Sequence, residues 1–378
     1  MTRSFRPPRI GLIACAMLAA AADPVVAETS SWVQREDDPA ARSSASRSNP
    51  ARPKRRPATA EAKPTDLLEG PGISAHSKST SGFEKSKPQS GIAKPELGKD
   101  DPYFAFDQGR YLTALQLAQK EADKGDSRAH TLIARIHAEG LGVPKNDGLA
   151  AQWYKRAAEL GDIDGIFAYG VILAEGRGVE KDRSGAGQMF ERAAKTGHAA
   201  ANYNLGLLFL RGDGKPENPY RAAQHIRYAA EQGIAAAQYD LATLYQTGTG
   251  VPHDAVETSK WLRAAAEQGM AAAAYDYAVL LLKGLGLTAD EPKAVEYLRT
   301  AADKNISGAQ NRLAHVYLKG IGVKKDTVEA AKWRIIAKAG GFGEDKELDG
   351  MISGLSKAER AKAEAAAVQW REKKLLPF

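Results

Sequence analysis

A 36-residue pattern recurs six times along this chain without a change in spacing. Two glycines mark it, at positions 16 and 18 of each unit when the first unit is counted from Gly125. The glycines at position 16 are Gly140, Gly176, Gly212, Gly248, Gly284 and Gly320. A fixed period of this length is typical of stacked supersecondary units, each of which contacts only its neighbours. The pattern therefore predicts a repeat protein and not a domain with one central core.

Each unit is predicted to fold as two helices. In the third unit, helical patterns run from about 199 to 210 and from about 219 to 231. Glycine at position 16 supplies a left-handed stop for the first helix, and glycine at position 18 lets the turn continue at positive φ. Asn or Asp at position 22 is expected to N-cap the second helix; these residues are Asn146, Asp182, Asn218, Asp254, Asp290 and Asp326. The sequence thus predicts an all-α solenoid of helix-turn-helix repeats over residues 125–340.

Small residues recur inside the first helix of each unit. Position 5 is Ala or Gly throughout, and so is position 10. Side chains without bulk beyond Cβ let helix axes approach toward about 8 Å, the short end of the usual range. We expect these positions to be the points of closest contact between helices.

The segment before the repeats predicts export followed by a tether. Residues 1–27 resemble a signal peptide with cleavage after Ala27, because their apolar run is too short to span a bilayer of about 30 Å. A lipidated Cys15 and an uncleaved anchor remain alternatives. Residues 28–100 are rich in Pro, Ser, Lys and Arg, and are expected to be disordered. The predicted location is the periplasm or the medium.

Two flanking segments are expected to cap the stack: residues 101–124 as a helical unit before it and residues 341–378 as helices after it. Ser356 and Glu359 have the spacing of a capping box, which predicts a helix from there to about Glu372. The final residues, 375–378, are either packed on the stack or a free docking tail.

Charge and composition narrow the classes of partner. Residues 101–378 hold 37 Lys and Arg against 35 Asp and Glu, so this part is nearly neutral. That balance argues against nucleic acid as a partner. A basic run at 50–57 is either a solvated part of the tether or an anchor for an acidic polymer. The sequence does not define an oligomeric state.

A search for catalytic patterns predicts no enzyme, no cofactor and no metal site. Phosphate-binding Gly-x₄-Gly-Lys loops, Gly-x-Ser-x-Gly elbows and His-Glu-x₂-His motifs do not occur in the sequence. His130 and His137 lie about 10 Å apart along a helix, too far to hold one metal as a pair. Asp162 and Asp164 are expected to interact with the start of a helix. A cell-wall or β-lactam hydrolase remains an alternative function, as does a polysaccharide-binding or wall-binding module.

The repeat carries recognisable motifs, including Gly-x-Gly-Val before the second helix and Trp-Tyr-x₂-Ala-Ala within it, as at 140–143 and 153–158. In these motifs the chain resembles the Sel-one-like repeat family, a relative of the tetratricopeptide repeat. The resemblance implies a right-handed superhelical solenoid that serves as an adaptor in protein–protein contacts and signalling. The layout is similar to periplasmic regulators of exopolysaccharide synthesis that restrain an envelope sensor kinase. A secreted branch linked to β-lactams carries a disulfide in each repeat, which this chain lacks.

By analogy with tetratricopeptide stacks, the first helices should line a groove that binds a protein partner. The partner is expected to be an envelope or membrane protein, so that any membrane association is indirect. Aromatic residues at position 7 either bind the partner or fill space between repeats. Asp240 and Asp276 are expected to form a solvated acidic strip, with a specific clamp on the partner as the alternative. The candidate groove residues are Arg135, Phe167, Tyr203, Asn204, Leu207, Tyr239, Asp240, Thr243, Tyr275, Asp276, Arg312 and His315.

Overall fold

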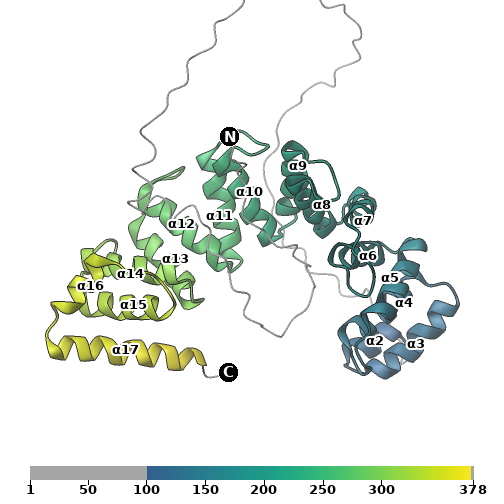
Figure 1. Cartoon of the computed structure of the whole chain (residues 1–378), viewed down its shortest axis with the longest axis horizontal. Helices are drawn as coiled ribbons and strands as arrows, with labels where there is room; N and C mark the ends of the chain where they lie inside the picture. The colour runs from purple at the N-terminus through teal and green to yellow at the C-terminus, as the bar shows by residue number, and fades with distance from the viewer. Residues whose placement is uncertain (1–99, 376–378) are drawn as a thin grey trace, which may run out of the picture. The chain divides into compact units, whose positions relative to one another are not determined.

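Figure 1 shows the chain as a computed structural model, which describes residues 100–375. All regular structure within that range is helical, in sixteen helices. The predicted signal peptide, most of the tether and the last three residues lie outside the described range. Among the described residues no helix is long and apolar enough to cross a membrane.

Two helices precede the repeats, α2 (Pro102–Asp107) and α3 (Tyr111–Asp123). The Asp101 side chain N-caps α2, with its Oδ1 2.7 Å from the Tyr103 amide nitrogen. The two helices are separated at Gly109, whose φ of 71° belongs to the left-handed region. The segment expected as a helical unit is therefore a short helical hairpin, because this glycine interrupts the helical pattern.

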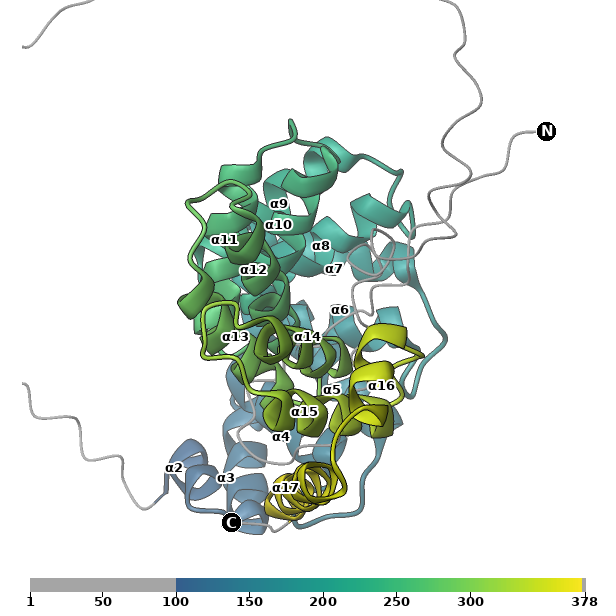
Figure 2. The same ribbon diagram turned by 90° about the vertical axis from the view of Figure 1, so that its left-hand side faces the viewer.

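Twelve helices of 13 residues each follow, two for each repeat. The first helix of each repeat is here called helix A: α4 (Ser127–Glu139), α6 (Ile163–Glu175), α8 (Ala199–Arg211), α10 (Ala235–Thr247), α12 (Ala271–Lys283) and α14 (Ser307–Lys319). The second is helix B: α5 (Asp147–Glu159), α7 (Arg183–Lys195), α9 (Pro219–Glu231), α11 (Ala255–Glu267), α13 (Glu291–Asp303) and α15 (Thr327–Ala339). Each helix packs against the one before and the one after it, which is the arrangement of an α-solenoid (Figures 1 and 2).

The helix boundaries follow the predicted chemistry. The C-cap glycine of every helix A has φ between 65° and 76°, as the left-handed stop requires. All six Asn or Asp residues at position 22 N-cap helix B, each accepting a backbone N–H. The turn glycines have a second role: a Cβ on Gly286 would lie 2.0 Å from the Ala255 carbonyl oxygen. The turn therefore packs against the start of the preceding helix B.

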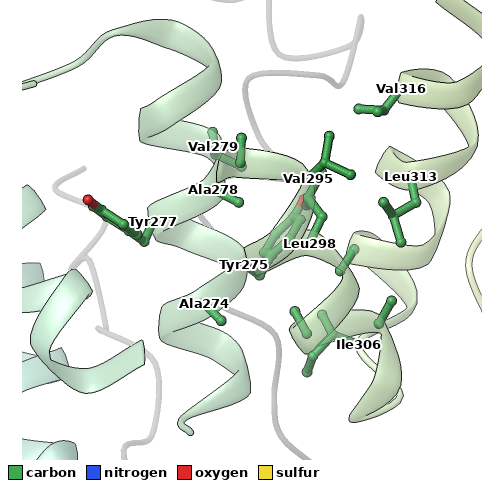
Figure 3. Close-up of a cluster of buried hydrophobic side chains, with 14 of the residues drawn as sticks. Ala274, Tyr275, Tyr277, Ala278, Val279, Val295, Leu298, Ile306, Leu313 and Val316 are labelled. Atoms are coloured by element: carbon green, nitrogen blue, oxygen red, sulfur yellow. The ribbon is translucent and has the colours of Figure 1, made fainter. Parts of the chain in front are cut away.

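The core is continuous from one repeat into the next. Figure 3 shows Tyr275 and Ala278 of α12 beside Leu298 of α13 and Leu313 of α14, so one cluster joins two repeats. The small positions are points of close contact: a Cβ on Gly206 would lie 2.7 Å from Ile226. No repeat covers its own apolar faces, so stability depends on the neighbouring repeats.

Two helices follow the last repeat, α16 (Lys346–Ser353) and α17 (Lys357–Leu375). The predicted capping box is confirmed, since the Ser356 amide lies 3.1 Å from Glu359 Oε2 and the Glu359 amide lies 3.3 Å from Ser356 Oγ. Helix α17 packs on α15, where the indole rings of Trp370 and Trp333 meet edge to face at 5.7 Å.

Candidate functional site

The candidate groove residues all lie on helix A, but they divide sharply by exposure. Half-buried members occur from the first repeat to the last: Arg135, Phe167, Tyr239, Thr243, Arg312 and His315. The others are buried: Tyr203, Asn204, Leu207, Asp240, Tyr275 and Asp276. We call the half-buried set the helix-A row.

Two buried carboxylates connect neighbouring repeats. The Tyr203 hydroxyl donates to Asp240 Oδ2 at 2.8 Å, and the Tyr239 hydroxyl donates to Asp276 Oδ2 at the same distance. In each pair, position 7 of one repeat contacts position 8 of the next. These pairs, here called rungs, fix the spacing between successive helices A because a hydrogen bond weakens steeply outside a narrow range of distance and angle.

Where no rung forms, the residue at position 8 is also of a type that suits the position-7 residue of the preceding repeat. Phe167 has no hydroxyl group, and its ring stacks on His198 at 4.6 Å. The corresponding residue in the next repeat, Asn204, donates to the Ala200 carbonyl of its own helix at 3.0 Å. At the other end, the Arg312 guanidinium lies 5.9 Å from the centre of the Tyr275 ring, within cation–π range. Position 8 is thus an acid only opposite a tyrosine.

The prediction of a solvated acidic strip is wrong. Asp240 is 7% exposed and Asp276 is 1% exposed, and each accepts a hydrogen bond from a tyrosine. Burial raises the pKa of Asp240 to about 6, against the opposing effects of the Tyr203 hydrogen bond and the Arg211 charge. The sequence pattern could not reveal this, because position 8 becomes enclosed only when the next repeat packs.

The buried half of the candidate set has a packing role in this structure. Tyr203 is 1% exposed, and Leu207 is fully buried in the same cluster. Of the two alternatives for the position-7 aromatics, packing therefore describes Tyr203. Contact between a partner and the helix-A row remains a prediction. Arg135 is part of this row, with its guanidinium over the Phe106 ring at 4.8 Å and its Nε 2.8 Å from Glu139.

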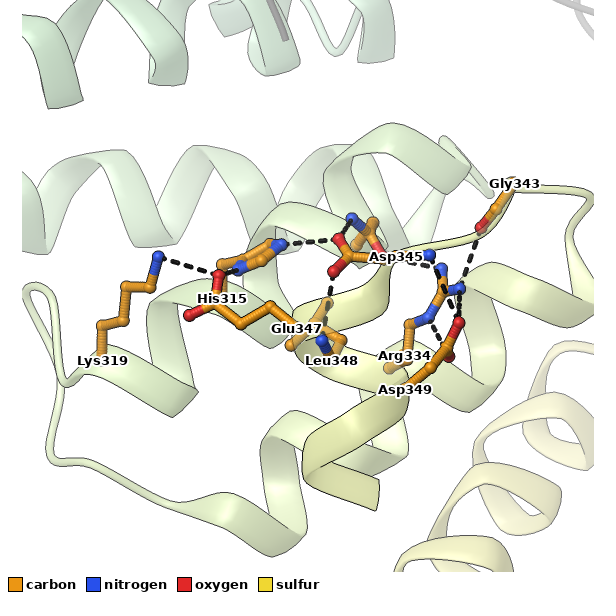
Figure 4. Close-up of polar contacts among 9 residues, drawn as sticks. His315, Lys319, Arg334, Gly343, Asp345, Glu347, Leu348 and Asp349 are labelled. Carbon is orange, nitrogen blue, oxygen red and sulfur yellow. Dashed lines mark hydrogen bonds and ion pairs between the residues drawn. The ribbon is translucent and has the colours of Figure 1, made fainter. Parts of the chain in front are cut away.

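Sequence reasoning missed a charged network at the end of the repeats (Figure 4). Arg334 of α15 is fully buried, and it donates to both oxygens of Asp349 at 2.8 Å. It also donates to Asn311 Oδ1 at 3.0 Å and to the Gly343 carbonyl at 2.9 Å. These bonds from Arg334 are the main reason that the pKa of Asp349 falls to about 2. The network connects α15 to α16 and to the loop before it.

His315, a member of the helix-A row, is part of the same end structure. Its Nε2 lies 2.7 Å from Asp345 Oδ2, and its Nδ1 lies 3.4 Å from Glu347 Oε2. Lys319 approaches Glu347 at 3.2 Å. The repeat pattern ends before Asp345, so no periodic signal predicted that these acids would face His315.

The other titratable residues singled out by the sequence have local structural contacts. Asp162 caps α6 through the Gly165 amide at 2.8 Å, as expected for an acid at a helix start. The His130 ring packs on Trp153 at 5.3 Å, and its Nδ1 lies 2.8 Å from the Asp126 carbonyl oxygen. Within residues 100–375 no three His, Cys, Asp or Glu side chains gather as metal ligands.

Comparison with known proteins agrees with this architecture. A family model described as Sel1 repeat matches residues 127–162, 163–198, 199–234, 235–270, 271–306 and 307–341. A Sel1 repeat protein from Oxalobacter formigenes is 28% identical, with a TM-score of 0.55 over 62% of this chain and 94% of that one. A protective antigen from uropathogenic Escherichia coli strains, displaying an SLR fold, is 26% identical, with a TM-score of 0.47 over 71% of this chain and 68% of that one. No curated protein matches the sequence.

Proposed function

The chain belongs to the Sel1 repeat family, and we propose that it is an exported adaptor that binds a protein partner in the cell envelope through its helix-A row. Sel1 repeats generally act in protein–protein interaction, and their fold is typically a non-catalytic scaffold. For this chain the location is the cell envelope, the surface is the helix-A row and the partner is an envelope or membrane protein. Binding restrains a membrane signalling protein.

One observation carries the choice of surface: half-buried side chains occur at corresponding positions of the helices A in the first, second, fourth and sixth repeats. The row combines aromatic rings, guanidinium groups and hydroxyls. Aromatic and arginine side chains dominate the energetics of most protein interfaces. The rungs join α8, α10 and α12, and the bond from Tyr239 to Asp276 holds the Tyr239 ring of the row in place, so less side-chain entropy is lost there when a partner binds.

The proposed location rests on the sequence before the repeats. Residues 1–27 have the basic start, short apolar run and small residues of a signal peptide. To test it, the full-length chain is produced in its source organism, the cells are fractionated, and the amino terminus of the recovered protein is sequenced. We expect protein in the periplasmic fraction that begins at Glu28. Full-length protein confined to the cytosol would contradict export.

The proposed surface is tested by capturing partners from envelope extracts. In the test variant, Arg135 and Arg312 are changed to Ala and Thr243 to Glu. The control changes the same residue types on helix B, with Arg156→Ala, Arg263→Ala and Thr300→Glu. Thr243 and Thr300 each donate to a carbonyl four residues earlier in the chain, and Thr300 is the more exposed of the two. Each variant removes two arginines and adds one glutamate, so both alter the charge equally.

We expect the control to recover the partner as the wild type does, and the helix-A variant to lose at least about tenfold in affinity, as for removal of interface hot spots. Circular dichroism verifies that both variants are folded. Equal recovery by the two folded variants would exclude the helix-A row as the contact surface.

A further inference from the structure

A hollow of about 740 Å³ lies where the fifth repeat meets the sixth. It is lined by the end of α13, by α14, and by the turn that leads into α15. Three of the lining side chains are cationic: Arg299, Lys324 and Lys325. The remaining lining residues are Tyr317, Val323, Asp326 and Thr327. A volume of this size falls within the usual range of small-molecule sites, about 300 to 1,000 Å³.

Hydrogen-bond donors outnumber acceptors in this hollow. The Arg299 Nη2 donates to the Tyr317 hydroxyl oxygen at 2.6 Å, which leaves the phenolic O–H of Tyr317 as a donor. Lys324 and Lys325 form no ion pair with any residue of the described range. The one lining acid, Asp326, uses its Oδ1 to cap α15 through the Glu329 amide at 2.9 Å. A ligand that fits must therefore supply acceptors and negative charge.

The junction between the third and fourth repeats has the Arg–Tyr pair of this hollow but not its lysines. Arg227 donates to the Tyr245 hydroxyl at 2.8 Å, in the same relation as Arg299 and Tyr317. However, the turn beside it reads Val251-Pro252-His253, with no lysine. The Arg–Tyr pair is thus a recurring structural contact. A lysine at the position of Lys325 also occurs in the first and second repeats, but among the six repeats the sixth alone has two lysines in this turn.

We propose that this hollow binds a soluble phosphate-bearing ligand. Three cations and the one acid, Asp326, leave two positive charges in the lining, which a dianionic phosphate group balances and a single carboxylate does not. In this arrangement the guanidinium and the lysines contact phosphate oxygens, and the Tyr317 hydroxyl donates to one of them. The site is separate from the helix-A row and does not depend on the partner proposed above.

The test is calorimetric titration of the full-length protein with inorganic pyrophosphate at low salt. The variant Lys324→Ala/Lys325→Ala is compared with Lys145→Ala/Lys181→Ala. Lys145 and Lys181 occupy the position of Lys325 in the first and second repeats, so the control removes the same charge. We expect the first variant to bind at least about tenfold more weakly than the wild type, and the control to be unchanged.

A second pair of variants separates the hollow from general lysine charge. Arg299→Leu and Arg227→Leu each break an Arg–Tyr hydrogen bond at equivalent positions of two repeats, and the Arg227–Tyr245 bond is the less exposed of the two. Only Arg299→Leu is expected to weaken pyrophosphate binding. Three results would overturn the proposal: no binding by the wild type, equal weakening in a variant and its control, or lysine-dependent binding to phosphatidylglycerol vesicles without binding to pyrophosphate.

Discussion

Asp240 places a carboxyl group inside the stack, where burial raises its pKa to about 6 and Tyr203 donates a hydrogen bond to it. In the unfolded chain this pKa returns to about 3.9. Between these values the folded protein binds more protons than the unfolded one, so stability falls as the pH rises from about 4 through 6. The ionised carboxylate at neutral pH therefore costs stability at this rung, by roughly 3 kcal/mol for a shift of about two pKa units.

Replacing Asp240 with Asn should remove that cost, because the amide carries no charge and its oxygen still accepts from Tyr203. As the pH rises from 4.5 to 7.5, we expect the free energy of unfolding of Asp240→Asn to increase by roughly 2 to 3 kcal/mol relative to that of the wild type. Urea unfolding at several pH values measures the difference. Asp107→Asn, at an exposed position, is the control and should leave the pH dependence unchanged. If the free energy of unfolding of Asp240→Asn changed with pH as steeply as that of the wild type, the Asp240 carboxyl group would not titrate between pH 4.5 and pH 7.5.

At the scale of the helix and its turn, two kinds of glycine serve different purposes. Gly233 has φ +87°, and a Cβ there would have no atom within 4 Å. Gly286 has φ +71°, and a Cβ there would lie 2.0 Å from the Ala255 carbonyl oxygen. The first glycine is needed only for its backbone conformation. The second is also needed because the turn packs directly on the backbone of the preceding repeat.

The two alanine substitutions should therefore differ in cost. Gly233→Ala adds only left-handed strain, about 1 to 2 kcal/mol. Gly286→Ala adds the displacement of a packed turn, so we expect at least about twice that loss in the free energy of unfolding. Chemical denaturation of both variants measures it. Equal losses would mean that the turn moves away freely and that its contact with Ala255 contributes little.

Sequence reasoning succeeded for elements whose ends depend on local chemistry. The second helix of the third repeat was predicted from about 219 to 231, and it is Pro219–Glu231. Its start depends on the Asn218 side chain, which accepts the Arg221 amide at 3.0 Å within one turn of the chain. Capping and left-handed glycines involve neighbouring residues, so a single sequence contains what is needed to recognise them.

The rungs and the end network could not be predicted in the same way. A rung joins residues that are 37 positions apart in the sequence. Only the packing of the helices A shows that both residues are buried between repeats. One signal was present: Tyr203 and Tyr239 are each followed by Asp at that spacing, and Phe167 by Asn. Arg334 gave no signal at all, because its partner Asp349 lies beyond the last repeat, where the period is lost.

At the scale of the whole described stack, each repeat contacts mainly its two neighbours, so a complete repeat should be removable. The rungs predict which repeat is removed at least cost. Deleting residues 235–270 brings Tyr203 to the position opposite Asp276, which recreates a Tyr–Asp rung. Deleting residues 199–234 instead places Phe167 opposite Asp240 and leaves the buried carboxyl group without a tyrosine hydroxyl.

We expect both deletion proteins to fold, with the one lacking 235–270 more stable by about 1 to 3 kcal/mol, the usual cost of an unsatisfied buried polar group. Circular dichroism and urea unfolding of the two proteins measure this difference. If the protein lacking 199–234 were the more stable, the rungs would not be what sets the fit between repeats.

Contact between a protein partner and the helices A can be measured in living cells. The most direct measurement is site-specific photo-crosslinking in cells, with a benzophenone amino acid at Thr243 on helix A or at the matched Thr300 on helix B. We expect a discrete crosslinked species from position 243, of the same mass in every preparation, and none from position 300. Crosslinks from position 300 with none from position 243 would contradict it.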